Sequence, residues 1–238
     1  MLTFSLLLSV SLSANAYDFE VDGIRYNIIP AGDNACEVTS RDWSEGYYSG
    51  DIAIPASVNY DGKTYSVTAI GNDAFNECDN LASIKLPCSI KKIGTRAFKR
   101  CYALASVEIP NSVTEIGEDA FYECHSLASA TIPNSVTTIG NSAFSSCKGL
   151  TSIDIPNSVT KIGYGAFSGT GLFSIELPNS VTAIEDMVFA YCDSLTTVTI
   201  PGSVTTIGEA AFYVSGLVSI EIPGSVTRIK KEAFERCR

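Results

Sequence analysis

The sequence predicts a solenoid, in which short coils rich in β-structure stack along one axis, and two observations carry this prediction. Eight of the nine prolines recur at steps of 22 or 23 residues after a first step of 32: Pro55, Pro87, Pro110, Pro133, Pro156, Pro178, Pro201 and Pro223. Such a period is typical of solenoids and related repeat arrays. Eight of the eleven phenylalanines recur in the same way: Phe75, Phe98, Phe121, Phe144, Phe167, Phe189, Phe212 and Phe234. Stacked coils place equivalent residues side by side, so the stack itself forms the core.

Each repeated unit predicts three local structures. The segment L-x-x-I-x-I carries β-branched residues and alternates at its end, which indicates a strand, and equivalent strands would form a parallel sheet. The segment V-T-x-I-G predicts a second, shorter extended piece. The segment x-x-A-F-x-x-C is too short for a full helix and predicts one helical or 3₁₀ turn.

Residues 17–66 precede the first full unit and predict a small β-rich cap. Asp-Gly pairs at 22–23 and 61–62 favour hairpin turns. A polar terminal element of this kind covers the open end of a solenoid. The alternative is a separate binding module with three aromatic contact residues: Trp43, Tyr47 and Tyr48.

The composition excludes several functional classes. Of 238 residues, 45% are hydrophobic, so the chain can bury a core, and the formal charge of −10 argues against nucleic acid as a partner. The only histidine, His125, argues against most zinc sites and against Ser-His-Asp chemistry. It occupies a position where other units carry Tyr102, Lys148 or Asp193, so we expect an exposed, inert side chain. We expect no catalytic residues, no metal and no cofactor.

The first sixteen residues are typical of a secretory signal peptide. An apolar run from Leu2 to Leu12 ends in Ala-Asn-Ala at 14–16, which predicts cleavage before Tyr17. The run is shorter than the roughly 20 residues that span a membrane, and no later stretch is long and apolar enough to serve as an anchor. A core strand is the alternative. We therefore expect a secreted or cell-surface protein without a transmembrane segment after signal removal.

Six of the eight cysteines lie three residues after a repeated phenylalanine: Cys78, Cys101, Cys124, Cys147, Cys192 and Cys237. Side chains in such a column point the same way and do not face each other. We therefore expect buried free thiols that act as small apolar fillers. Cys36 and Cys88 lie off the column, and a disulfide between them is an open alternative.

The unit I-P-N-S-V-T-x-I-G-x-x-A-F-x-x-C-x-x-L-x-S-I resembles the BspA-like leucine-rich repeat, also called the Treponema pallidum-type repeat, over residues 67–238. YDFEVDGIRYNI and IPASVNYDGKTYSVTAIG resemble the N-terminal region of secreted members from Bacteroidales. The resemblance implies the α/β leucine-rich-repeat class, strongly β-rich. It implies a right-handed solenoid of about eight 22–23-residue coils, the last incomplete, behind the small cap.

Three residues depart from the family pattern. Cys88 replaces the asparagine after proline, and Glu185 and Lys230 replace the glycine of V-T-x-I-G. The last two indicate that the special backbone freedom of glycine is not required there.

Two columns of positions along the predicted sheet should face outward and form a candidate binding face. The first holds hydroxyl side chains: Ser106, Ser129, Ser152, Ser174, Thr197 and Ser219. The second mixes hydroxyls and carboxylates: Glu108, Thr131, Asp154, Glu176, Thr199 and Glu221. Strands also need soluble residues outward, which is the alternative interpretation. Asp154 and Glu176 could hold calcium, but two carboxylates are few, and a solvated acidic pair is favoured.

A candidate basic patch lies in or beside one unit: Lys85, Lys91, Lys92, Arg96, Lys99 and Arg100. A second group of bases lies at the end: Arg228, Lys230, Lys231, Arg236 and Arg238. Such patches could engage a sulfated glycan or an acidic partner, and solvated surface is the alternative.

The family resemblance implies adhesion to host matrix proteins or to other cells, and no enzyme activity. We therefore expect binding to an extracellular protein or glycoprotein. The alternative is a structural spacer, or a truncated paralogue of a larger surface protein, with no ligand of its own. The final unit stops directly after Cys237. Its open apolar end suggests possible self-association.

Overall fold

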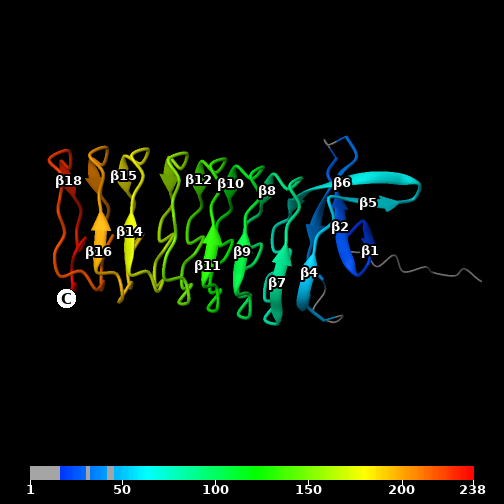
Figure 1. Cartoon of the computed structure of the whole chain (residues 1–238), viewed down its shortest axis with the longest axis horizontal. Helices are drawn as coiled ribbons and strands as arrows, with labels where there is room; N and C mark the ends of the chain where they lie inside the picture. Colours follow the sequence, from blue (N-terminus) through cyan, green and yellow to red (C-terminus); the bar gives the residue numbers. More distant parts are fainter. Residues whose placement is uncertain (1–16, 31–32, 42–45) are drawn as a thin grey trace, which may run out of the picture.

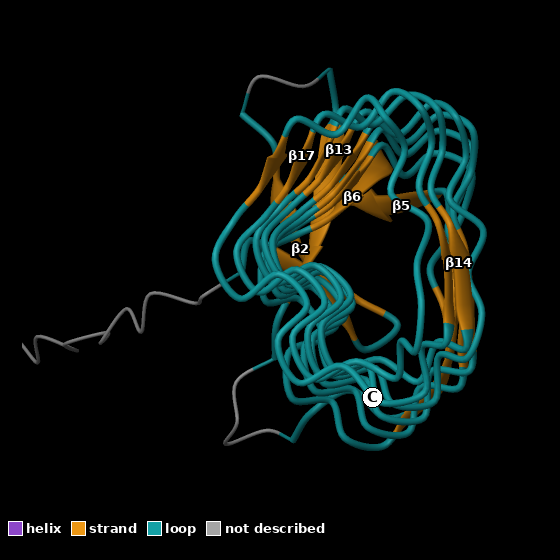
Figure 2. Ribbon diagram, turned by 90° about the vertical axis from the view of Figure 1, so that its left-hand side faces the viewer, coloured by secondary structure: helices purple, strands orange, loops and turns teal. Residues whose placement is uncertain are grey.

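In the computed structural model, which describes residues 17–30, 33–41 and 46–238, the chain forms a stack of coils. Figure 1 shows the coils side by side along the long axis, from the N-terminal strands to the C-terminus. Figure 2 shows the same coils nearly superposed around a common interior. Within the described residues every regular element is a strand. The predicted signal peptide (1–16) and Trp43 lie outside the described residues.

The N-terminal region is a small antiparallel arrangement. Strand β1 (Phe19–Val21) pairs with β2 (Ile24–Ile28), which pairs with β3 (Ala35–Thr39), both antiparallel. The β1–β2 turn has positive φ at Asp22 (50°) and Gly23 (76°), as a two-residue hairpin turn requires. Strand β5 (Ser57–Tyr60) forms a second hairpin with β6 (Lys63–Ile70).

One set of coil strands continues directly from this region. Strand β6, which holds the first V-T-x-I segment, pairs in parallel with both β3 and the short strand of the next coil, so the N-terminal region and the coils share a sheet. That sheet continues through β8 (Lys92–Ile93), β10 (Glu115–Ile116), β12 (Thr138–Ile139) and β13 (Lys161–Ile162). A second sheet then holds β15 (Ala183–Ile184), β17 (Thr206–Ile207) and β18 (Arg228–Ile229). The break falls at the first of the 22-residue steps.

The L-x-x-I-x-I strands occupy another side of the coil, where Figure 2 labels β14. They form three parallel pairs: β4 (Gly50–Ala53) with β7 (Leu81–Lys85), β9 (Ser106–Glu108) with β11 (Ser129–Thr131), and β14 (Ser174–Glu176) with β16 (Thr197–Thr199). The expected continuous sheet is therefore interrupted. Residues 152–154 and 219–221 form no strand. Single hydrogen bonds link the neighbouring backbone instead, such as the Phe173 N–H to the Thr151 carbonyl at 3.2 Å.

The expected helical or 3₁₀ turn is wrong, and the hydrogen bonds explain why. Around Phe75, alternate N–H groups bond within the coil, as from Cys78 to the Phe75 carbonyl at 3.2 Å. The intervening N–H groups bond to the next coil, as from Phe75 to the Ala97 carbonyl at 2.8 Å. The residues two before and two after Phe75 have positive φ, Asp73 at 57° and Glu77 at 60°, which a right-handed helix excludes.

This geometry repeats in every coil, at the positions two residues before and two residues after each ladder phenylalanine. Only the coil around Phe167 has glycine at both positions, Gly165 and Gly169.

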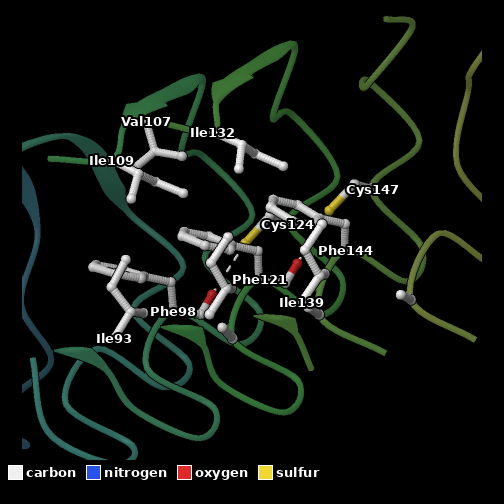
Figure 3. Packing of buried hydrophobic residues seen from close by; sticks show 14 of the residues in the cluster. Ile93, Phe98, Val107, Ile109, Phe121, Cys124, Ile132, Ile139, Phe144 and Cys147 are labelled. Atoms are coloured by element: carbon white, nitrogen blue, oxygen red, sulfur yellow. Dashed lines mark hydrogen bonds between the residues drawn. The ribbon is translucent and has the colours of Figure 1, made fainter. Parts of the chain in front are cut away.

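The phenylalanines form a stacked column through the core. Phe98, Phe121 and Phe144 lie with ring centroids 5.2 Å apart and planes within 9° of parallel (Figure 3). Seven ladder rings, from Phe75 to Phe212, are fully buried, whereas Phe234 in the final coil is partly exposed. Burial of each such ring stabilises the fold by about 1.5–3 kcal/mol, so the column holds neighbouring coils together.

The glycine of V-T-x-I-G serves close approach of the backbones. A Cβ added at Gly117 would lie 2.6 Å from the backbone of Gly94 in the preceding coil. Neither glycine has positive φ, in agreement with the expectation that backbone freedom is not needed there. A Cβ at Gly208 would likewise lie 2.5 Å from the backbone of Glu185.

Candidate functional site

The two outward columns lie on the L-x-x-I-x-I side of the coils. The strand register places Ser106 beside Ser129 and Glu108 beside Thr131 in β9 and β11. In β14 and β16 it places Ser174 beside Thr197 and Glu176 beside Thr199. All twelve candidate side chains are exposed, including the four outside strands: Ser152, Asp154, Ser219 and Glu221.

A shallow groove crosses the first part of this face. It has a volume of about 630 Å³ and is lined partly by Lys85, Cys88, Glu108, Asn111 and Thr131. Its walls combine one cation, one carboxylate, hydroxyl and amide groups with several apolar side chains, such as Leu86 and Ile109. The groove therefore offers hydrogen-bond donors and acceptors beside an apolar surface.

A smaller hollow of about 200 Å³ lies between Asp154 and Glu176, with Asn157 and Asn179 in its lining. Four oxygen-bearing side chains face this hollow, of which two are carboxylates. Within the described residues, no group of three or more His, Cys, Asp or Glu side chains is placed to hold a metal ion.

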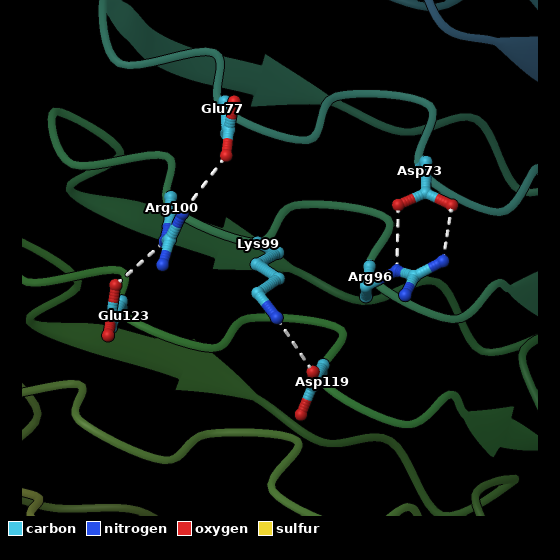
Figure 4. A network of polar contacts seen from close by, with 7 residues as sticks. All are labelled: Asp73, Glu77, Arg96, Lys99, Arg100, Asp119 and Glu123. Carbon is cyan, nitrogen blue, oxygen red and sulfur yellow. Dashed lines mark hydrogen bonds and ion pairs between the residues drawn. The ribbon is translucent and has the colours of Figure 1, made fainter.

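The candidate basic patch is divided by the fold. Lys85 lies in β7 and Lys92 in β8, on different sides of the coil. Arg96, Lys99 and Arg100, which Figure 4 shows, lie on the turn segments that carry the phenylalanines, and each pairs with carboxylates of neighbouring coils. This corrects the expectation of a single basic surface, because sequence proximity within one unit does not show the carboxylates that adjacent units contribute.

The ion pairs in Figure 4 follow the repeat. Arg96 makes a bidentate contact with Asp73, one coil earlier, at 2.8 and 3.0 Å. Arg100 lies between two carboxylates, 3.0 Å from Glu77 and 2.9 Å from Glu123. The third cation, Lys99, pairs with Asp119 at 3.0 Å, and Lys91 is exposed.

The cysteine column is buried and hydrogen-bonded. Each thiol from Cys101 onward donates to the carbonyl of the ladder phenylalanine in the preceding coil, as Cys124 does to Phe98 at 3.0 Å. Burial raises the pKa of the Cys78 thiol to about 12 and that of Cys147 well above its usual value. Cys237 in the final coil is partly exposed.

All eight cysteines are free thiols. Cys36 is buried in β3 whereas Cys88 is exposed, and the two form no disulfide in the structure. Burial raises the pKa of Cys36 to about 12.

Two members of the column are not cysteines. Thr170 and Ser215 also lie three residues after a ladder phenylalanine, and both are buried. The Thr170 hydroxyl donates to the Phe167 carbonyl at 2.8 Å and lies 3.3 Å from the Cys192 sulfur. Their spacing from the phenylalanine identifies them as members of the column, but a search for cysteines alone does not find them.

His125 is exposed, as expected, but it has a partner. Its ring stacks on Tyr102 of the preceding coil with centroids 5.0 Å apart. In the N-terminal region, Tyr48 is buried and its hydroxyl bonds to the Arg25 N–H and the Thr39 carbonyl. Tyr47 is 44% exposed. Of this pair, only Tyr47 is accessible to a partner.

A hollow with tyrosine walls lies on the turn side of the C-terminal coils. It was not predicted from the sequence. It has a volume of about 360 Å³ and these lining residues: Tyr164, Asp186, Met187, Tyr191, Glu209, Ala210, Tyr213 and Glu232. No single unit shows the hollow, because its lining residues come from four successive units and the three tyrosines occupy different positions in theirs.

These features define a class: a strand-rich leucine-rich-repeat solenoid whose exposed positions recur in columns. The chain matches the family described as the BspA type leucine rich repeat region, in six copies, over residues 63–147 and 114–238. The protein belongs to this family, which confirms the resemblance seen in the sequence.

Solved structures agree with this assignment. A leucine-rich repeat protein from Bacteroides ovatus is 32% identical with a TM-score of 0.70, covering 90% of this chain and 61% of its own. A leucine rich cell surface protein from Faecalibacterium prausnitzii is 36% identical with a TM-score of 0.65, covering 92% and 52% respectively. The chain thus spans less than two thirds of either relative's length.

The Treponema pallidum leucine rich repeat protein is 30% identical with a TM-score of 0.68, covering 79% of this chain and 86% of its own. Comparison with curated proteins finds no match. Among the residues that the structure describes, no helix has the length and apolar character needed to cross a membrane.

Proposed function

We propose that the protein binds an extracellular protein or glycoprotein through the two outward columns described above, which we call the hydroxyl–carboxylate face. The observation that supports this is the alignment of twelve exposed polar side chains on successive coils. Repeat solenoids bind partners over such extended surfaces. The cell-surface description of the Faecalibacterium relative supports a location outside the cytoplasm.

The chemistry of the face favours a polar partner. Serine and threonine hydroxyls both donate and accept hydrogen bonds, whereas the carboxylates of Glu108, Asp154, Glu176 and Glu221 only accept. The groove beside Glu108 and Thr131 adds a concave feature at one end of the face. A partner rich in hydroxyl, amide or cationic groups matches this surface.

Binding of residues 17–238 to arrays of matrix proteins and glycans tests the proposal. Thr131→Arg, on the face, should weaken binding to any partner found by about tenfold or more, because a bulky cation would stand in the contact surface. Thr114→Arg is the matched control, because Thr114 is an exposed threonine of the same unit on the V-T-x-I side. Equal losses in both variants, or no binding above background, would favour a structural spacer.

Export by the predicted signal peptide belongs to the same proposal. Expression of the whole chain in a bacterium should yield secreted or surface protein whose N-terminal residue is Tyr17. Retention of residues 1–16 on the product would contradict this part.

A further inference from the structure

The tyrosine-walled hollow on the turn side lacks the arginine–carboxylate pairs of the earlier coils. There, Arg96 pairs with Asp73, and Arg100 lies between Glu77 and Glu123. The position equivalent to Arg96, two residues before a ladder phenylalanine, is Ala210 in the hollow. The position equivalent to Asp73, the partner of Arg96, is Met187, so neither member of that ion pair is present in the hollow. The carboxylates of the lining lie at other positions: Asp186 and Glu209 three residues before their ladder phenylalanines, and Glu232 in the next unit.

The chain's own lysines neutralise only some of the carboxylates that line the hollow. Lys230 pairs with Asp186 at 2.8 Å, which holds the pKa of that carboxyl below its usual value. Lys231 pairs with Glu232 at 2.7 Å. Among the described residues, no cation makes an ion pair with the Glu209 carboxylate. Lys231 is near enough that its pKa is raised, mainly by Glu232 and to a lesser degree by Glu209. The Glu209 backbone N–H bonds to Asp186. Of the three carboxylates in the lining, Glu209 is therefore the one without a direct ion pair.

The aromatic walls of the hollow are also available. Tyr164 is 50% exposed and Tyr191 is 49% exposed. The Tyr164 hydroxyl donates to the Met187 sulfur at 2.7 Å, which fixes one wall, and Tyr191 meets Tyr213 edge to face at 5.5 Å. The Arg236 guanidinium already lies 5.6 Å from the Tyr213 ring centroid. Planar cations favour such ring faces.

We propose that this hollow binds an arginine side chain presented by a basic segment of a partner protein. The guanidinium would lie over Ala210, pair with the Glu209 carboxylate and pack against the rings of Tyr164 and Tyr191. Arginine suits the site because its planar head both stacks on aromatic faces and pairs with carboxylates. The hollow lies on the turn segments and not on β14 or β16, so the inference stands independently of the hydroxyl–carboxylate face.

The test uses an acetylated Gly-Arg-Gly amide peptide and its citrulline counterpart, which has nearly the same shape without the charge. Titration into protein with ¹³C-labelled tyrosine rings should shift the signals of Tyr164, Tyr191 and Tyr213. The citrulline peptide should bind at least fivefold more weakly. Shifts that spread over other tyrosines, or equal binding of both peptides, would overturn the proposal.

Two variants locate the contact. Glu209→Gln should weaken arginine binding about two- to fivefold, as expected for one exposed charge contact, and Tyr191→Leu should do the same through loss of the ring. Glu118→Gln is the matched control, since Glu118 is exposed and occupies the same unit position in a coil without the hollow. An equal loss in Glu118→Gln would identify general attraction to an acidic protein and refute the site. Unchanged thermal melting shows that each variant is folded.

Discussion

At the scale of single residues, the cysteine column shows how one position serves two needs. Its members fill the space beside the phenylalanines, and each from Cys101 onward donates a hydrogen bond to a backbone carbonyl of the preceding coil. Thr170 also donates a hydrogen bond, but to the Phe167 carbonyl of its own coil. The position therefore accepts a small buried donor whose acceptor lies in either of two coils, and the thiol itself is not essential.

Thiol reactivity should separate the cysteines into two groups. At pH 8 the exposed Cys88 should react at once with a disulfide reagent, and the partly exposed Cys237 more slowly. The other six should react only on unfolding, because they are buried and burial raises the pKa of thiols such as Cys78. Counting released chromophore before and after adding denaturant measures this. Rapid native reaction of more than two thiols would contradict the burial.

The sequence allowed the column to be predicted, but not its complete membership or its charged surroundings. The period alone placed six cysteines in one line. Thr170 and Ser215 share that line by spacing but differ in residue type, and the structure shows that both are buried like the cysteines. The pairing of Arg100 with Glu77 and Glu123 joins three units, and a surface patch inferred from adjacent bases could not include it.

At the scale of elements, the turn segment is the feature that the sequence described least well. Its length indicated a helical turn, yet alternate N–H groups point to the next coil, which requires positive φ at two positions per unit. Most units have residues other than glycine at these positive-φ positions, such as Glu77 or Arg100. Local propensity is therefore overruled by the hydrogen bonds that stacking makes available, and those bonds are invisible in one unit taken alone.

Gly169→Ala should lower the free energy of unfolding by about 1 kcal/mol, because Gly169 has φ of 66° and a side chain is strained there. A steric clash does not contribute to this loss of stability, since the nearest atom to the added Cβ would lie 3.5 Å away. Gly202→Ala is the control: it has no positive φ and nothing within 4 Å, so stability should be unchanged or slightly raised. Urea unfolding measures both, and equal effects would contradict the argument.

At the scale of the whole molecule, stability is shared between neighbours along one axis. The phenylalanine column and the backbone bonds between successive coils run the length of the stack. The period predicted this arrangement correctly. The break in the V-T-x-I strands coincides with the first 22-residue step, whereas the interruptions of the L-x-x-I-x-I strands were not predicted from the repeat pattern.

Phe144→Ala should cost about 3–5 kcal/mol of unfolding free energy, because a fully buried ring between two stacked rings is removed. His125→Ala should change stability by less than about 0.5 kcal/mol, since the imidazole is exposed and touches only Tyr102 among aromatic rings of the described residues. Denaturant titration of both variants checks the contrast. Similar losses would mean that the column does not dominate the core.

The ion pairs between coils also bear on how a gene for such a protein can change in length. Deletion of the 23 residues centred on Arg100 would bring Glu77 and Glu123 onto adjacent coils without the guanidinium that separates them. Loss or duplication of a unit at Ser146 or Gly169, the equivalent neutral positions, would disturb no ion pair at that position. Copy number can therefore vary at lower energetic cost in the middle of the stack than near its N-terminal end.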